Sequence, residues 1–307
     1  MRKILGINFS HNCSFAYFEN NVLKEYYEED RFNKIKNFEP PHTINQEYEY
    51  ITLKKFKNII FDKIVFVSFD RGDILIEKHF IDNILKQIKF KDFKFYNNEH
   101  HMFHAISGFY FSNFNEALCI ISDGGGEVLH RDLRVLESIF YIKNKKIKTF
   151  YKHYSNAKND FFNIYIKIPV EKNIKINNVD IKLSNKETGG LKYLNYTISA
   201  GFKEYEEGQL MGIAAYKNKN TNLDKNVLEI ANKAQNETLQ ERIKLIEKAL
   251  TYNNCKNIIL SGGYHLNCSN NFKLVKHFSK LNFFVDPIAH DGGTAVGVAA
   301  YETYYKK

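Results

Sequence analysis

The chain has 307 residues, of which 44% are hydrophobic and 26% charged, a balance typical of a folded globular protein with one large domain or two lobes. No apolar run approaches the roughly 20 residues of a membrane span. The N-terminus lacks the long apolar core and small-residue cleavage site of a signal peptide, so we expect a cytoplasmic protein without a membrane segment.

The net charge of +9 makes a polyanion such as nucleic acid a candidate partner. The lysines are spread out, with one short cluster at 143–148, and the abundance of Lys, Asn, Ile, Phe and Tyr is also what an AT-rich genome produces. Charge alone therefore does not identify a nucleic-acid-binding protein. The four cysteines are scattered without a Cys-x-x-Cys pair, which favours reduced thiols over a disulfide framework or a structural zinc site.

The first third of the chain predicts a β-meander followed by an α/β arrangement with a mixed sheet. Asn20-Asn21 marks a turn, and Pro40-Pro41 closes the meander. Apolar spacing predicts a helix over 74–88, and a further helix is expected at His100. The expected strands are 4–9, 13–18, 22–28 and 64–69.

A second α/β pattern follows. A hairpin is expected about Asn144-Lys145, and residues 152–186 form an insertion carrying a small hairpin. Helices are predicted over 223–250, from about residue 267, and over 294–301. The expected strands are 117–122, 138–142, 147–151, 258–260 and 283–285. Two such halves predict a bilobal α/β protein with an interlobe cleft.

The stretch 99–127 combines two features of chemical interest. His100 and His104 stand at i and i+4, so both imidazoles project from one face of a helix, which is a metal-ligand spacing. The strand at 117–122 ends in Asp-Gly-Gly-Gly-Glu, a turn that can bring backbone N–H groups against a phosphate. A solvated histidine pair and an ordinary hairpin turn are the alternatives. Together the features predict a metal beside a phosphoester.

Three glycine turns each follow an apolar strand, at 123–126, 261–263 and 291–293. Such turns bind the phosphate and sugar of a nucleotide, although three ordinary tight turns would look the same. Asp123 and Asp291 are the acids beside these turns and complete a two-His, two-Asp set. Mixed nitrogen and oxygen ligands suit Fe²⁺, Mn²⁺ or Zn²⁺ better than Mg²⁺ or Ca²⁺.

Three further residues are candidates. His11 lies where the first strand turns, either as a solvated turn residue or as a proton acceptor or hydrogen-bond donor in the cleft. Glu207 precedes a small apolar helix and either accepts two ribose hydroxyls or simply begins that helix. His101 lies between the faces of the pair and is a possible substrate contact. The remaining histidines, among them His290 beside Asp291, are expected to be structural or exposed.

These motifs resemble the O-carbamoyltransferases of the nodulation-protein and aminoglycoside-antibiotic type, specifically their catalytic domain. That domain is similar to the tRNA threonylcarbamoyl-transfer proteins of the actin/sugar-kinase superfamily, which has two RNase H-like lobes. The resembling segments keep the family's order from residue 4 to residue 301. They are ILGINFSHNCSFAYFENN, EEDRFNKIK, EHHMFHAISGFYFSNFNEALCIISDGGGE, GFKEYEEGQLMGIAAY, LSGGYHLNCSNN and DPIAHDGGTAVGVAAY.

The resemblance implies roles for individual residues. It implies a metal, usually iron, held by His100, His104, Asp123 and Asp291, and it places His11 at the reacting carbamoyl group. The implied nucleotide contacts are Gly124, Gly125 and Gly126 at the phosphate, Glu207 at the ribose, and Gly262, Gly263 and Asn267 on the adenine side.

The implied reaction moves a carbamoyl group from carbamoyl-adenylate, made from carbamoyl phosphate and ATP, to an acceptor hydroxyl. Family members make the adenylate in a C-terminal YrdC-like domain. This chain ends at Lys307, so we expect a YrdC-like partner protein, a longer parent chain or different chemistry. Gln209, where the family usually has Lys, and the extra Asp30 are smaller departures that affect the acceptor and nucleotide details.

The expected acceptor is a sugar or metabolite hydroxyl, or a hydroxymethylated base in nucleic acid. Two other readings remain: a transferase that moves threonylcarbamoyl to tRNA adenosine, and a non-catalytic nucleotide-binding subunit or sensor. For the domains, we expect one lobe from residues 1–118 completed by the C-terminal helix 294–307, and a second from 119–293.

Overall fold

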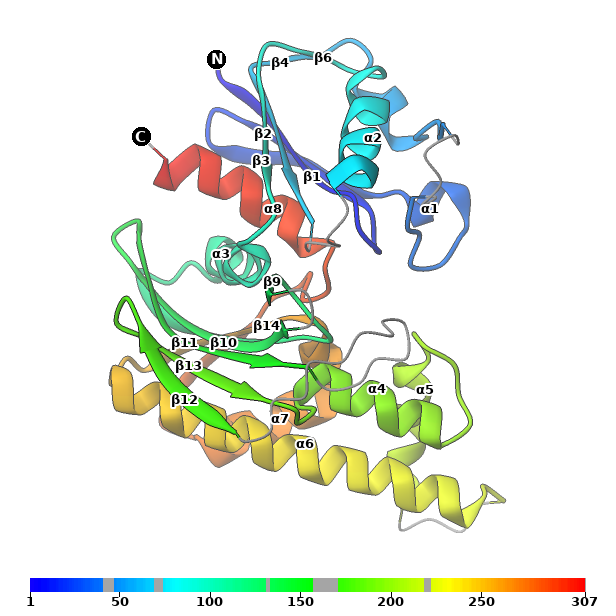
Figure 1. The fold of residues 1–307 in the computed structure, drawn as a ribbon, viewed down its shortest axis with the longest axis vertical. Helices are drawn as coiled ribbons and strands as arrows, with labels where there is room; N and C mark the ends of the chain where they lie inside the picture. Colours follow the sequence, from blue (N-terminus) through cyan, green and yellow to red (C-terminus); the bar gives the residue numbers. More distant parts are fainter. Residues whose placement is uncertain (41–46, 69–73, 131–132, 157–170, 218–221, 307) are drawn as a thin grey trace. The chain divides into compact units, whose positions relative to one another are not determined.

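The computed structural model describes residues 1–40, 47–68, 74–130, 133–156, 171–217 and 222–306. The chain forms two compact units (Figure 1). The first comprises 1–113, 126–131 and 286–307, and the second comprises 114–125 and 132–285. The expected boundary after residue 118 thus falls inside a strand of the second unit, and 286–293 lie in the first. Among the described residues, no helix combines the length and apolar character that crossing a membrane requires.

The first unit is built on a mixed sheet with strand order β3-β2-β1-β5-β7. The strands β1, β2 and β3 form an antiparallel meander, whereas β5 and β7 run parallel to β1. A short parallel pair, β4 with β6, lies in the same unit. The strands are β1 (Lys3–Asn8), β2 (Ser14–Glu19), β3 (Val22–Glu28), β4 (Ile60–Phe61), β5 (Lys63–Val67), β6 (Lys89–Phe90), β7 (Phe93–Tyr96) and β9 (Val128–His130).

Alternate residues of β1 face two different layers, as the period of two along a strand requires. Leu5 and Ile7 pack into an aromatic-rich core with Ile81 and Ile84 of the helix over 74–85. On the other face Gly6 meets the C-terminal helix, where an added Cβ would lie 2.1 Å from the Ala295 carbonyl oxygen. The helices of this unit are α1 (Asp30–Asn33), η1 (Thr52–Phe56), α2 (Ile74–Leu85), α3 (His100–Ser112), α8 (Gly293–Ala300) and η3 (Tyr301–Tyr305).

The second unit has a longer mixed sheet of order β12-β13-β11-β10-β8-β14-β15. Its central strands β8 and β14 run parallel, and apolar side chains from both pack against α6 and α7. The strands are β8 (Glu116–Ser122), β10 (Leu133–Lys143), β11 (Lys146–Ser155), β12 (Lys172–Ile176), β13 (Val179–Ser184), β14 (Asn257–Ser261) and β15 (Asn282–Val285).

Helices α4 and α5 pack with α6 around a small separate core that includes Tyr193, Leu210 and Tyr264. The Asp224 carboxylate caps α6 by accepting from two backbone N–H groups, and Asn267 caps α7. The helices of this unit are α4 (Gly189–Ser199), α5 (Glu207–Ala214), α6 (Lys225–Tyr252), η2 (Gly263–Leu266) and α7 (Cys268–His277).

Most predicted elements are confirmed to within a few residues, including the turns at Asn20-Asn21 and Asn144-Lys145, where both residues of each pair have positive φ. Helix α4 was not predicted, because it begins with two glycines and carries few strong helix formers. Pro41 and the expected strand end at Phe69 lie outside the described residues.

Candidate functional site

The predicted histidine pair lies in the first turns of α3. His100 and His104 are fully buried, and their Nε2 atoms lie 3.1 Å apart. One helical turn separates the two residues, so the rings meet edge to face with centroids 4.8 Å apart. Two imidazole nitrogens thus lie close together in the buried interior.

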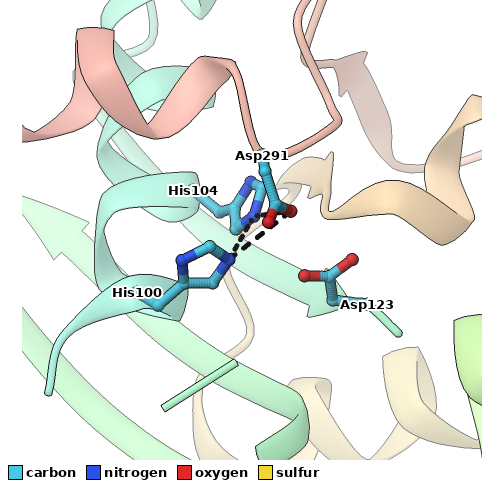
Figure 2. A group of neighbouring side chains, drawn as sticks. All are labelled: His100, His104, Asp123 and Asp291. Carbon is cyan, nitrogen blue, oxygen red and sulfur yellow. Dashed lines mark hydrogen bonds and ion pairs between the residues drawn. The ribbon is translucent and has the colours of Figure 1, made fainter. Parts of the chain in front are cut away.

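Asp291 faces this pair from the turn before α8 (Figure 2). Its Oδ1 lies 3.5 Å from His100 Nε2 and 3.6 Å from His104 Nε2. Its Oδ2 lies 3.2 Å from Nε2 of His11, in the turn after β1. The Asp291 carboxylate therefore lies between the histidine pair and the partly exposed His11, and the structure brings these four predicted residues together in the first unit.

The donor set of this cluster fits a divalent metal ion. Two ligand nitrogens bound to one ion at about 2.0–2.1 Å lie roughly 3 Å apart, close to the spacing of the two Nε2 atoms. Imidazoles with carboxylates suit Fe²⁺, Mn²⁺ or Zn²⁺. In the first unit His100, His104 and Asp291 are buried residues of ligand type that could hold such an ion, and Asp123, at the end of β8 in the second unit, is a further buried carboxylate of ligand type, also drawn in Figure 2.

Glu127, which the sequence analysis did not single out, positions α3. It is 2% exposed, and its Oε2 accepts the backbone N–H of His101 at 3.1 Å. A carboxylate at a helix N-terminus satisfies an orphan donor and complements the helix dipole. His101 thus contributes its backbone to the anchoring of the helix, and its side chain is buried.

A chain of hydrogen bonds supports the turn that carries Asp291. His290 Nε2 lies 3.3 Å from Oε1 of Glu28, and His290 Nδ1 accepts the N–H of Gly292 at 3.1 Å. Tyr26 donates to Glu28 at 3.0 Å and Arg31 at 2.9 Å. Burial disfavours the charged form of Glu28, but the hydrogen bond from His290 leads the opposing interactions, and the pKa of Glu28 is lowered.

In the second unit two predicted glycine turns lie side by side at the ends of parallel strands β8 and β14. Gly263 donates its N–H to Asp123 Oδ1 at 3.0 Å. Gly262 has φ +93°, and an added Cβ would lie 2.3 Å from the Ser122 carbonyl oxygen, so only glycine fits there. Gly124 is exposed, with open space where a Cβ would project, which leaves its backbone accessible to a phosphate. Gly125 is the last residue of this segment of the second unit, and Gly126 belongs to the first.

A third glycine pair at the start of α4 packs against the same loop. An added Cβ on Gly190 would lie 2.7 Å from Gly124 N, and one on Gly189 would lie 2.2 Å from Ser122 Oγ. This close approach places the N-terminus of an 11-residue helix beside the Asp123–Gly124 backbone. The Gly-Gly pair at 189–190 was the available sequence signal, but it does not follow an apolar strand as the other turns do.

A buried ion pair lies beneath this loop. Arg242 of α6 donates to Glu137 of β10 and to the Ser122 hydroxyl. Burial alone would raise the pKa of Glu137, but the Arg242 charge and the nearby His153 hold it well below its usual value. Ser122, which directly precedes Asp123, is therefore hydrogen-bonded to the buried Arg242 of α6.

The other predicted nucleotide residues have local partners. Asn267 is buried: its Oδ1 caps α7, and its Nδ2 donates to Gln235 Oε1 at 2.8 Å. Glu207 is partly exposed at the start of α5 and accepts the Tyr205 N–H at 3.3 Å. His265 lies in η2, between the glycine turn at 262–263 and Asn267, the N-cap of α7. Burial of the His265 side chain lowers its pKa to about 3.

Comparison with known proteins adds a family match. Residues 9–248 match the family described as "Carbamoyltransferase N-terminus". The chain is similar to "Uncharacterized protein sll1178" of Synechocystis sp. (strain ATCC 27184 / PCC 6803 / Kazusa), at 24% identity over 350 residues covering 97% of this chain and 56% of that protein. It spans about half the length of that relative.

Solved structures show the fold. Full-length HypF, in a phosphate- and nucleotide-bound form, matches with TM-score 0.60 and 12% identity over 98% of this chain and 55% of HypF. A ROK family protein from Streptococcus pneumoniae TIGR4, in complex with sucrose, matches with TM-score 0.54 and 10% identity over 98% of both chains. The ROK hexokinase of Thermus thermophilus matches with TM-score 0.50 and 7% identity over 97% of both chains. The chain has the α/β actin/sugar-kinase-like fold of these proteins.

Proposed function

The chain belongs to the carbamoyltransferase family, and we propose that it moves a carbamoyl group from carbamoyl-adenylate to an acceptor hydroxyl. The observation that carries this proposal is the cluster in which the Asp291 carboxylate lies 3.2 Å from His11 and 3.5 Å from His100. A proton acceptor is thereby held beside a buried ligand set, as a transfer to a hydroxyl requires.

His11 is the proposed base. A hydrogen bond from its Nε2–H to Asp291 Oδ2, across the 3.2 Å that separate these atoms, would place the proton-accepting lone pair on Nδ1. The acceptor oxygen attacks the carbamoyl carbon while its proton moves to His11. The bond between that carbon and the phosphate oxygen then breaks, and AMP leaves with the bonding electrons. The partial exposure of His11 suits a group that must meet an incoming substrate.

His100, His104, Asp123 and Asp291 are the proposed metal ligands, since all four are buried and of ligand type. Fe²⁺ is the first candidate, with Mn²⁺ and Zn²⁺ as alternatives. When bound, such an ion would neutralise charge on the phosphate leaving group. Asp291 would have two roles, because one of its oxygens faces the histidine pair and the other faces His11.

The glycine turns of the second unit are the proposed nucleotide contacts. Gly124 and Gly125, with Gly126, would offer backbone N–H groups to the AMP phosphate, and Glu207 would accept ribose hydroxyls. Gly262 and Gly263 would form the adenine side, with Asn267 holding their loop on α7. The similarity to a nucleotide-bound HypF structure supports this assignment.

Carbamoyl-adenylate would be made from carbamoyl phosphate and ATP by a YrdC-like domain or partner protein. We test the reaction by mixing the purified chain with such a protein, carbamoyl phosphate, ATP and a panel of acceptors. Mass spectrometry should detect an acceptor heavier by one carbamoyl group, together with released AMP. Absence of this product with every acceptor class, from a chain that retains its metal, would overturn the proposed reaction.

Two matched variants test the role of His11. His11→Ala should lose at least a hundredfold in transfer rate, the usual contribution of a general base. His277→Ala removes an exposed histidine at the end of α7 and should leave the rate unchanged. Equal rates for His11→Ala and the wild type would exclude His11 as the base.

The acceptor class is tested by salt. We propose a sugar or metabolite hydroxyl first, and a hydroxymethylated nucleic-acid base second because the net charge is +9. Binding that falls steeply with salt indicates the polyanion, because each phosphate contact releases counterions. Binding that is insensitive to salt indicates a neutral sugar. Transfer to tRNA that requires threonine would instead indicate a threonylcarbamoyl transferase.

A further inference from the structure

We propose that His290 is a positioning residue for Asp291: Glu28 holds the His290 ring, and the ring fixes the turn from which the Asp291 carboxylate projects. His290 itself need not touch the metal or the substrate. The inference rests on the metal site of the proposed function, and it adds residues from β3 and the loop before α8 that the ligand set does not include.

The His290 ring has a different partner on each nitrogen. Because Nδ1 accepts the Gly292 N–H at 3.1 Å, the proton of a neutral ring resides on Nε2. That N–H points to the Glu28 carboxylate 3.3 Å away. Glu28 is only 7% exposed and is itself held by Tyr26 and Arg31. Glu28 therefore favours the tautomer of His290 in which Nε2 carries the proton and Nδ1 accepts the Gly292 N–H.

The turn has little room to adopt another arrangement. The bond from Gly292 to His290 spans Asp291, so it fixes the backbone on both sides of the ligand. An added Cβ on Gly292 would lie 2.6 Å from Tyr26 Oη and 2.7 Å from the His290 ring. On the far side Ser14 donates to the Gly292 carbonyl at 2.8 Å, and Thr294 donates to the Asp291 carbonyl at 2.6 Å. Groups that orient metal ligands in this way commonly raise metal affinity 10- to 100-fold.

Three substitutions separate the two hydrogen bonds of the ring. His290→Ala removes both. His290→Asn keeps an acceptor where Nδ1 was, because an Asn side chain accepts from the N–H two residues on. His290→Gln keeps a donor that can reach Glu28 but loses the acceptor for Gly292. His277→Ala is the control for loss of a histidine at an exposed position.

The measurement is titration of the metal-free full-length chain with Co²⁺, followed by visible absorption and by chelator competition, with melting of each metal-free variant in parallel. We expect His290→Ala to bind Co²⁺ 10- to 100-fold more weakly. His290→Asn should recover most of the affinity, His290→Gln should stay weak, and His277→Ala should match the wild type. The absorption bands of bound Co²⁺ should shift in the Ala variant, because the ligand geometry changes.

Unchanged Co²⁺ affinity in His290→Ala would overturn the inference. Equal recovery of Co²⁺ affinity by His290→Asn and His290→Gln would also overturn it. So would a His290→Asn variant that melts as the wild type does but binds Co²⁺ no better than His290→Ala. A wild-type chain that binds no Co²⁺ would overturn both the metal site and this inference. A chain that shows the expected order of affinities but transfers no carbamoyl group would overturn only the proposed reaction.

Discussion

The buried ion pair of Arg242 and Glu137, next to the proposed nucleotide loop at 123–126, gives the strongest stability prediction. Arg242→Met keeps the apolar stem of the side chain and removes the guanidinium group, which leaves Glu137 charged and only 5% exposed. Removing one partner of a buried pair typically costs about 3–5 kcal/mol, because the remaining charge has lost its compensation. His153 stays 3.5 Å from Glu137 and relieves part of this cost, so we expect a value of about 3 kcal/mol, near the lower end.

Urea unfolding at pH 7 measures this loss, and melting should show a drop of roughly 5 °C for a chain of 307 residues. The double variant Arg242→Met/Glu137→Gln removes the stranded charge and should recover more than half of the lost stability. Lys244→Met is the matched control, because Lys244 is exposed on the same helix. If the single and double variants lost the same amount, or if the single variant lost under about 1 kcal/mol, an uncompensated charge could not be the cause.

The same substitution should weaken nucleotide binding by the folded chain. Arg242 also donates to the Ser122 hydroxyl, and Ser122 directly precedes Asp123 and Gly124. Without that bond the loop loses its link to α6. ATP affinity should therefore fall in Arg242→Met at temperatures where the variant is fully folded, whereas Lys244→Met should bind ATP as the wild type does.

Three further substitutions test other contacts. His265 has a pKa lowered by burial from 6.5 to about 3, so its stabilising contribution is complete above pH 6.5 and is lost as the pH falls toward 3. Between pH 6.5 and 4.5 urea unfolding should show the wild type losing about 2 kcal/mol more than His265→Gln, and equal losses would contradict this. Glu127→Ala removes the carboxylate that caps α3, so it should lower the free energy of unfolding in urea by about 1 kcal/mol and weaken Co²⁺ binding. Glu99→Ala is the control, because the Glu99 side chain makes no capping hydrogen bond to α3, and it should change neither quantity. Gly6→Ala would place a Cβ 2.1 Å from the Ala295 carbonyl oxygen of α8, so thermal melting should show a loss of stability of at least about 1–3 kcal/mol. Gly208→Ala is the control: its Cβ would meet nothing within 4 Å, so the protein should be equally or slightly more stable.

Local sequence patterns predicted several residues of the candidate site. The i and i+4 spacing of His100 and His104 is a property of one helix, and Asp123 follows a strand that reads as buried from its composition. Such signals need only a few neighbouring residues. Asp291, about 190 residues along the chain, joined the predicted set because it begins a glycine turn after an apolar strand, and the family resemblance implies the same ligand.

The supporting residues gave no comparable signal. Glu127 anchors α3 from 26 residues away, and Glu28 contacts His290 across a sequence separation of 290 − 28 = 262 residues. A glutamate after a glycine run, or one in a strand, has no pattern that names its partner. The Gly-Gly start of α4 was not predicted for a related reason, since its use depends on the loop at 122–124, far away in the sequence.

The packing of α3 against α8 explains how Asp291 comes to lie beside His100 and His104, the proposed ligands of the first unit. Asp291 lies two residues before α8, and α8 packs along α3, which carries both histidines. An added Cβ on Gly297 would lie 2.0 Å from the Phe103 carbonyl oxygen, so the two helices approach with no side chain between them at that point. The distance from Asp291 to the histidines is therefore set by core packing on both helices, and only the last step, across one turn, depends on a loop. Because His290 fixes that turn, the stability of the core and the placement of Asp291 can be changed separately. A substitution at Gly297 should mainly lower the melting temperature, whereas one at His290 should mainly weaken Co²⁺ binding.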